Sequence, residues 1–212
     1  MQNYLPVSFL LLLLAACQSS GPTHAVINTT QGAVEVLLYP ETPGHTNNFI
    51  QLAEEGYFDS TLFHRVIPGF MIQGGDPQSK GAPAGEVLGM GGPDYMLDPE
   101  IGAPHIYGAL AAARPPRDPE KKSNASQFYI VTGQLVDDAT LDQLERIKNI
   151  KYSEAQREAY RTLGGSPSLD QDYTVFGEVV DGMDVVERIA ELERDDYDRP
   201  LEDVIITGVT IR

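Results

Sequence analysis

The segment Phe63–Asp76 carries the residues of this chain that are best suited to chemistry. It reads Phe-His-Arg-Val-Ile-Pro-Gly-Phe-Met-Ile-Gln-Gly-Gly-Asp, so one guanidinium, that of Arg65, stands in an apolar, β-prone run. Phe70, Met71 and Gln73 follow at close spacing, and a Gly-Gly-Asp-Pro turn ends the run. A planar guanidinium among aromatic and thioether side chains is suited to donating several hydrogen bonds inside a groove. Alone, the pattern is more typical of a β-hairpin whose arginine is a surface charge.

A second group of residues, later in the chain, changes that interpretation. It contains Ser126–Ile130 (Ser-Gln-Phe-Tyr-Ile), Leu169-Asp170 and Tyr173–Gly177 (Tyr-Thr-Val-Phe-Gly). Together with Phe63–Asp76, these segments resemble the cyclophilin family of peptidyl-prolyl cis-trans isomerases. The resemblance runs from about Ala25 to Arg212 and includes Asn48-Phe49, Gly56–Phe58, Gly108–Arg114 and Gly182-Met183.

The resemblance implies rotation about the peptide bond that precedes proline. Amide conjugation gives this rotation a barrier of about 18–20 kcal/mol. No bond is broken, so we expect no nucleophile, metal or cofactor, and the enzyme must instead favour the twisted amide over both planar forms. In the twisted state the proline nitrogen can accept a hydrogen bond. By resemblance, Arg65 donates that bond, with Gln73 and Gln127 clamping a backbone carbonyl and orienting the guanidinium.

The remaining site residues are also taken from the resemblance. Apolar side chains are expected to form a pocket for the proline ring, main-chain groups to bind the extended substrate, and two further residues to lie beside the groove. The pocket residues are Phe70, Met71, Tyr129 and Leu169. The main-chain groups belong to Ala113 and Arg114, and the residues beside the groove are His64 and Tyr173.

Four positions depart from the family pattern. Tyr129 replaces a common phenylalanine, Tyr173 a common histidine and Arg114 a common asparagine. Ser168 stands where eukaryotic members carry the tryptophan that contacts cyclosporin, and the chain has no tryptophan. We therefore expect weak cyclosporin binding, with catalysis retained.

Two other functions compete with isomerisation. A non-catalytic chaperone or scaffold that binds proline peptides could use the same fold, but it would not need the guanidinium of Arg65 beside Phe70, Gln73 and Gln127. A barrel that carries an apolar ligand would need an open interior, and the large strand residues indicate a filled one. The expected partners are proline-containing segments of unfolded or extracytoplasmic client proteins, bound by a monomer.

Periodicity indicates many short strands. Alternation and turn residues predict them at about 24–28, 33–38, 62–66, 70–73, 107–113, 127–131, 173–179 and 204–211, the last with a bulge at Thr207-Gly208. Thr42-Pro43 begins a helix that Gly56 ends, and a second helix covers about 183–192. This content favours a closed antiparallel barrel. The resemblance implies the same mainly-β class, an eight-stranded barrel capped by two helices.

Residues 135–167 stand where the family has a short loop. Thr140-x-x-Gln143 and Ser153-x-x-Gln156 match capping boxes, and Gly164-Gly165 ends the second helix, so we predict an inserted helical hairpin. Two roles are open: it packs on the barrel as decoration, or it contacts protein clients. A client could meet its polar residues Asp142, Glu145, Arg146, Lys148 and Arg157.

The first residues resemble a lipoprotein leader. Phe9–Ala16 is an apolar run too short to span a membrane, and Leu14–Cys17 resembles a lipobox, although Met1–Pro6 contains no Lys or Arg. We expect a signal peptide at 1–16, a lipidated Cys17 with a tether at 17–23, and a cyclophilin-like domain at 24–212. The protein would then be exported and anchored in a membrane through acylated Cys17, facing the periplasm. The alternative is a coincidental cysteine.

Composition excludes several partners. The net charge of −16, from 31 acidic and 15 basic residues with no basic run, makes nucleic acid an improbable partner. Four isolated histidines and one cysteine offer no metal-ligand spacing. The length of 212 residues suits one domain with a substantial core.

Overall fold

The computed structural model describes residues 21–212. The predicted signal peptide, Cys17 and most of the tether lie outside this range, and Thr23, the last residue assigned to the tether, already belongs to the first strand. The described elements, in chain order, are β1 (Thr23–Thr29), β2 (Gly32–Leu38), α1 (Pro43–Glu54), β3 (Arg65–Ile67), β4 (Met71–Gly74), β5 (Met96–Leu97), β6 (Ala109–Ala112), β7 (Ser123–Asn124), β8 (Phe128–Val131), α2 (Asp138–Lys148), α3 (Glu154–Thr162), β9 (Val175–Asp181), α4 (Met183–Ala190) and β10 (Ile206–Ile211), with short 3₁₀ turns at Pro77–Ser79 and Pro167–Leu169.

One eight-stranded antiparallel sheet forms the body of the domain. Its order is β10-β1-β2-β9-β6-β8-β4-β3, and it contains every strand predicted from alternation. Each predicted span overlaps its strand, and the ends differ by at most three residues. The predicted bulge is confirmed, because Asn28 pairs with Gly208 and Thr29 with Ile206, which leaves Thr207 unpaired between them. Two further strands, β5 and β7, were not predicted, and they pair with each other in a separate two-stranded sheet.

The predicted closed barrel is wrong, because the sheet is an open half-barrel. Its edge strands, β3 and β10, are not neighbours in the sheet. One isolated bridge joins Leu62 to Ile205 just before the two strands begin. Beyond it, the Val66 amide in β3 donates to the Asp198 carbonyl at 2.8 Å. The segment between α4 and β10 therefore occupies the edge that β10 would need for closure.

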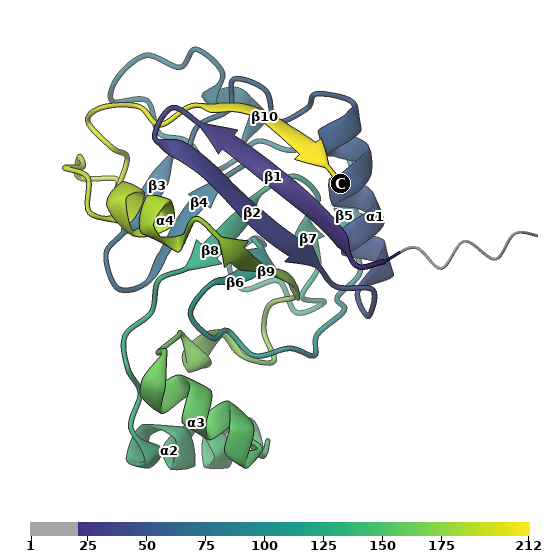
Figure 1. Cartoon of the computed structure of the whole chain (residues 1–212), viewed down its shortest axis with the longest axis vertical. Helices are drawn as coiled ribbons and strands as arrows, with labels where there is room; N and C mark the ends of the chain where they lie inside the picture. The colour runs from purple at the N-terminus through teal and green to yellow at the C-terminus, as the bar shows by residue number, and fades with distance from the viewer. Residues whose placement is uncertain (1–20) are drawn as a thin grey trace, which may run out of the picture.

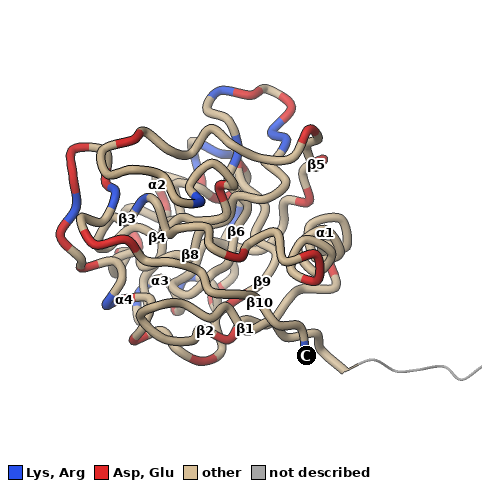
Figure 2. Tube along the Cα trace, turned by 90° about the horizontal axis from the view of Figure 1, so that it is seen from above, with Lys and Arg blue, Asp and Glu red and all other residues tan. Residues whose placement is uncertain are grey.

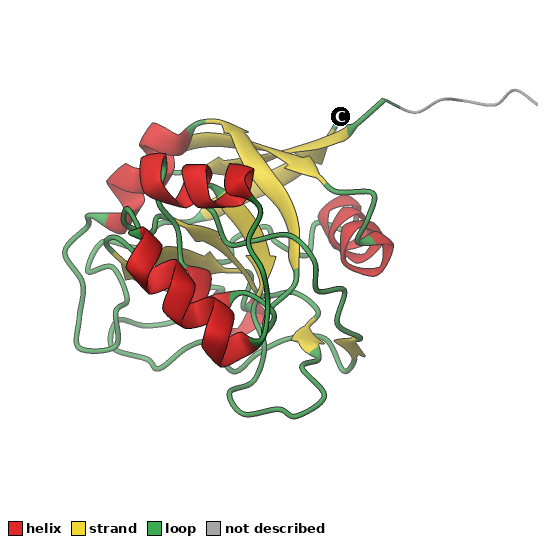
Figure 3. Cartoon of the chain, turned by 90° about the horizontal axis from the view of Figure 1, so that it is seen from below, coloured by secondary structure: helices red, strands yellow, loops and turns green. Residues whose placement is uncertain are grey.

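Strand alternation divides the apolar residues between two faces. One face packs against α1 and α4 in the main core, where the rings of Phe49 and Phe128 lie 5.6 Å apart. The predicted first helix is confirmed, although the Thr42 hydroxyl bonds the Tyr39 carbonyl rather than capping the helix. Figure 3 shows α1 alone on one side of the strands. The other face carries a second, smaller cluster that includes Met71, Tyr129 and Val175.

The predicted helical hairpin is confirmed as α2 and α3, which extend from the end of the sheet away from β10 (Figure 1). Ser153 and Gln156 form the predicted capping box. The first predicted box is wrong: Asp137 caps α2 by accepting from the Thr140 amide at 2.8 Å, so the helix begins two residues before Thr140.

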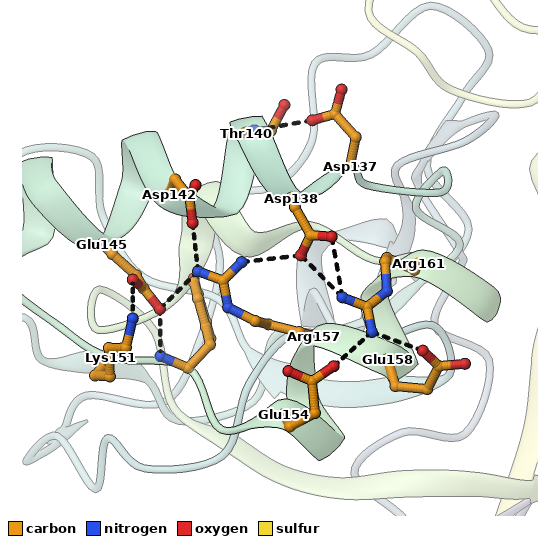
Figure 4. Close-up of polar contacts among 11 residues, drawn as sticks. Asp137, Asp138, Thr140, Asp142, Glu145, Lys151, Glu154, Arg157, Glu158 and Arg161 are labelled. Atoms are coloured by element: carbon orange, nitrogen blue, oxygen red, sulfur yellow. Dashed lines mark hydrogen bonds and ion pairs between the residues drawn. The ribbon is translucent and has the colours of Figure 1, made fainter.

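Ion pairs join the two helices of the hairpin, as Figure 4 shows. Arg157 donates to Asp138 at 2.9 Å and to Asp142 at 2.6 Å, and Arg161 also bonds Asp138 at 2.9 Å. Glu145 lies 3.0 Å from Arg157. Several residues that we expected to meet a client are therefore paired within the hairpin.

The charge is spread over the molecule. Figure 2 shows acidic residues on many separate segments, interspersed with basic ones. Among residues 21–212, the helices are too short or too polar to cross a membrane.

Candidate active site

Four adjacent strands bring two of the predicted catalytic residues, Arg65 and Gln73, into one row with Tyr129 and Ala111. Arg65 on β3 pairs with Gln73 on β4, Gln73 pairs with Tyr129 on β8, and Tyr129 pairs with Ala111 on β6. Because side chains on one row of a sheet point to the same face, these residues all project away from the main core. Their chain neighbours, such as Val66, Ile72 and Ile130, point inward to that core.

A pocket of about 240 Å³ opens beside this row. Its floor is apolar and buried, since Met71 is 2% exposed and Tyr129 is 4% exposed. The walls contain nearly all the side chains predicted from the sequence, together with Pro116, which the sequence analysis missed. The lining residues are Arg65, Phe70, Met71, Gln73, Ala113, Arg114, Pro116, Tyr129, Leu169 and Tyr173.

Arg65 lies at the solvent side of the pocket, with 40% of its side chain exposed. Its Nε is 3.5 Å from the Oδ2 of Asp198, in the segment between α4 and β10. The Asp198 backbone carbonyl also accepts from the amide of Val66. This bond holds residue 198 beside β3, the strand that carries Arg65. Asp198 was not predicted as a site residue, because nothing in its spacing links it to Arg65.

A chain of hydrogen bonds orients the two glutamines. Gln73 Nε2 donates to Gln127 Oε1 at 2.9 Å, and Gln127 Nε2 donates to the Gly91 carbonyl at 2.7 Å. Asp76, which is fully buried, accepts from the amides of Gly89 at 2.5 Å and Gly91 at 3.4 Å. A Cβ at Gly91 would lie 2.1 Å from Asp76 Oδ1, so only glycine fits there. The Gly-Gly-Asp-Pro turn that ends the first motif therefore holds the loop that contacts Gln127. Gln127 does not line the pocket.

The aromatic wall has polar support as well. The ring of Tyr173 meets that of Tyr129 edge-on at 6.0 Å, and the Arg114 guanidinium lies 4.8 Å from the Tyr173 ring centroid. Burial raises the pKa of Tyr129 well above its ordinary value, so its hydroxyl stays protonated. That hydroxyl is 3.0 Å from His105 Nε2, a residue that the sequence analysis did not identify.

His64 is placed differently from the other predicted residues. It is 3% exposed and lies outside the pocket wall, although it directly precedes Arg65. Neither ring nitrogen bonds a side chain or backbone group of residues 21–212. Burial lowers the pKa of His64 to about 4, so the ring is neutral at physiological pH. We therefore do not expect His64 to contact the substrate.

Main-chain contacts also differ from the expectation. The Ala113 amide donates to the Gln127 carbonyl at 2.9 Å, and the Ala113 carbonyl accepts from the Asn124 amide at 2.8 Å. We therefore expect main-chain binding of an extended substrate at Arg114 rather than at Ala113, because the Arg114 backbone has no backbone hydrogen-bond partner in residues 21–212.

This geometry suits the binding of an apolar ring next to a polar amide. The apolar floor can exclude water from a ring of proline size, while the guanidinium and the Gln73 amide project from the same row toward its edge. Such a site positions and polarises a bound peptide without requiring covalent chemistry.

Residues 24–211 match the family described as cyclophilin type peptidyl-prolyl cis-trans isomerase/CLD. A Staphylococcus aureus protein that carries the name of a peptidyl-prolyl cis-trans isomerase is 35% identical over 192 residues, which are 90% of this chain and 92% of that protein. A Staphylococcus saprophyticus protein of the same name is 35% identical over 187 residues, 88% of this chain and 90% of its own length.

Solved structures agree with these matches. A Cryptosporidium parvum cyclophilin type peptidyl-prolyl cis-trans isomerase, crystallised in the presence of the dipeptide Ala-Pro, is 27% identical, has a TM-score of 0.62, and covers 89% of this chain and 98% of its own. A second structure of that protein is 26% identical with a TM-score of 0.64, and covers 91% of this chain and 98% of its own. The chain belongs to the cyclophilin-type family and is a peptidyl-prolyl cis-trans isomerase.

Proposed function

We propose that the pocket takes the proline ring of a client segment and that Arg65 donates a hydrogen bond to the proline nitrogen as the amide twists. The observation that carries this role is the row in which Arg65 stands beside Gln73 at the edge of an apolar pocket. A hydrogen bond to a charged group contributes about 1.5–3 kcal/mol. At about 1.36 kcal/mol for each factor of ten, Arg65 supplies roughly one to two decades of rate.

The remaining acceleration comes from holding the peptide. Gln73, fixed by Gln127, binds the carbonyl on one side of the rotating bond, while Phe70 and Met71 enclose the ring. A ring enclosed by Phe70 and Met71 lets the chain before it rotate, so binding energy favours the twisted amide. The Ala-Pro dipeptide used with the related Cryptosporidium parvum structure supports an Xaa-Pro ligand for this pocket.

A protease-coupled assay on a short Ala-Pro peptide tests the mechanism. We expect Arg65→Ala to lower kcat/KM by roughly ten- to a hundredfold. The matched control is Arg188→Ala, because Arg188 is a half-exposed arginine on α4 that pairs with Asp184. The competing function, a non-catalytic chaperone or scaffold that binds proline peptides, predicts peptide binding without turnover. Equal kcat/KM values for the wild type and Arg65→Ala would refute the role of Arg65.

We also propose that the protein is an exported lipoprotein that acts as a monomer on extracytoplasmic clients. The support is the leader itself, in which Cys17 follows an apolar run and precedes the fold by only a few residues. A diacylglyceryl group on Cys17 gives stable anchoring, and the short tether would hold the domain near the membrane surface. Mass spectrometry of the membrane fraction decides this: an unmodified Cys17 thiol, or cleavage elsewhere, contradicts it. Cys17→Ala should release an active domain from the membrane.

A further inference from the structure

Asp170 joins the inserted hairpin to the wall of the pocket. It directly follows Leu169, a lining residue, and its side chain is only 4% exposed. Oδ1 accepts from the backbone amide of His105 at 2.7 Å and lies 2.8 Å from His105 Nδ1. Oδ2 accepts from the hydroxyls of Tyr152 at 2.8 Å and Tyr160 at 2.6 Å. Each oxygen of this buried carboxylate therefore has two partners. Those of Oδ1 both belong to His105, in the loop before β6, and those of Oδ2 belong to the hairpin.

His105 continues the connection to Tyr129. An ionised carboxylate can only accept, so the Nδ1 of His105 carries a proton where it faces Asp170. In the neutral ring Nε2 is then an acceptor, and the Tyr129 hydroxyl, 3.0 Å away, donates to it. The two rings stack at 6.0 Å with an angle of 13° between their planes. Asp170 thus fixes both the tautomer of His105 and the direction of the Tyr129 hydroxyl.

The hairpin is docked firmly enough to transmit its position. Tyr160 is fully buried and Tyr152 is 6% exposed, in a small core of their own with Leu141. The Ser166 amide donates to the His105 carbonyl at 2.8 Å, so the chain returns from the hairpin directly onto His105. A Cβ at Gly165 would lie 2.3 Å from the His105 carbonyl oxygen and 2.7 Å from the Tyr160 ring, so no other residue fits between them.

We propose that the hairpin supports the active site: Tyr152 and Tyr160 hold Asp170, and Asp170 acts through His105 as a positioning residue for the Tyr129 wall of the proline pocket. This inference rests on the proposed function of that pocket. The sequence left two roles open for the hairpin, decoration of the barrel or contact with protein clients. A supporting role differs from both, because it affects every substrate that enters the pocket, small peptides included.

The predicted effect falls on substrate binding. Tyr129 contacts the ring in the ground state and in the twisted state alike, and loss of such uniform binding raises KM while kcat is kept. Removing one hydroxyl by Tyr160→Phe should raise KM for an Ala-Pro tetrapeptide by roughly three- to tenfold, because only part of the free energy of a hydrogen bond to a charged group reaches the pocket through His105. Tyr95→Phe is the matched control, because the Tyr95 hydroxyl bonds Asn48 at 2.7 Å in an exposed position outside this cluster.

A double-mutant cycle separates positioning from general stabilisation. Tyr129→Phe, combined with Tyr160→Phe, breaks the connection at both ends. If Tyr160 acts through His105 on Tyr129, Tyr160→Phe should raise KM in the wild-type background and leave KM unchanged in the Tyr129→Phe background. Circular dichroism and urea melts of each variant verify that it is folded under assay conditions.

The outcomes distinguish this inference from the proposed function. An unchanged KM in Tyr160→Phe, or equal factors in the two backgrounds, overturns the positioning role while the effect of Arg65→Ala stands. An effect on a refolding protein substrate alone also overturns it, and indicates instead that the hairpin contacts clients. Absence of turnover in the wild type, or no loss in Arg65→Ala, would refute the proposed function itself.

Discussion

Acidification should weaken the fold through His64, whose buried ring is held neutral. The ordinary pKa of histidine is about 6.5, and burial lowers that of His64 to about 4. Between these values the unfolded chain binds a proton at this residue and the folded chain does not. Stability therefore falls as the pH falls through this window, and above pH 6.5 the residue makes no pH-dependent contribution. A span of about 2.5 pH units, at about 1.36 kcal/mol each, gives about 3 kcal/mol by pH 4.

Urea denaturation of the wild type and of His64→Gln, at about pH 7, 5.5 and 4, measures this term. Burial also lowers the pKa of His45, and carboxylates titrate at the acidic end, but both proteins share these groups. The difference in unfolding free energy between the two proteins isolates His64. His24→Gln is the control, because the His24 side chain is 30% exposed and lies outside the core.

The expected result is a wild-type advantage that shrinks with acidification. His64→Gln loses packing at every pH, but it should lose about 3 kcal/mol less than the wild type between pH 6.5 and 4. Parallel pH profiles for the two proteins would show that the ring takes up its proton over the same pH range in the folded and the unfolded chain. That result would refute the burial argument and reopen a role for His64 in the groove.

The remaining predictions concern catalysis. Arg65→Lys should lose roughly ten- to a hundredfold in kcat/KM with an unchanged circular dichroism spectrum, because an ammonium cannot hold the fork geometry of a guanidinium; turnover near that of the wild type would contradict the arginine mechanism. The value of kcat/KM should be nearly flat from about pH 6 to 8, since bond rotation transfers no proton and Arg65 stays charged; a tenfold step would reveal a proton transfer. Asp198→Asn should lower kcat/KM at most about threefold, and less at high salt, because the pair is 3.5 Å long and half-exposed; a loss as large as that of Arg65→Ala would show that Asp198 does more than orient the guanidinium.

Local signals predicted most of the fold. Alternation identified the strands of the sheet, and the Ser153–Gln156 box and paired glycines identified the hairpin. Closure of the sheet could not be predicted in the same way, because it depends on which segment reaches the outer edge of β3. That segment contains Asp198 and has no apolar period. Tertiary contacts, and not a local pattern, place this segment instead of β10 beside β3.

The site divides along the same line. Arg65, Gln73 and Tyr129 were predicted together from the resemblance to the family, and the structure brings them together because residues of one parity on neighbouring strands share a face. The same rule explains the misplacement of His64: it precedes Arg65 by one residue, so its side chain points to the opposite face, into the interior. The family pattern named both residues, and alternation alone would have separated them.

The supporting residues were out of reach for a different reason. Asp198 meets Arg65, Asp76 holds the loop behind Gln127, and His105 meets Tyr129, each across a long separation in the chain. No periodicity relates such pairs, and each side chain alone is an ordinary polar residue of a loop. Strand alternation thus places Arg65, Met71, Gln73 and Tyr129 on one face, while loop residues complete the pocket wall and hold these side chains in position. Substitutions in those loops, including the inserted hairpin, should therefore change how well the pocket binds proline while leaving every lining residue in place.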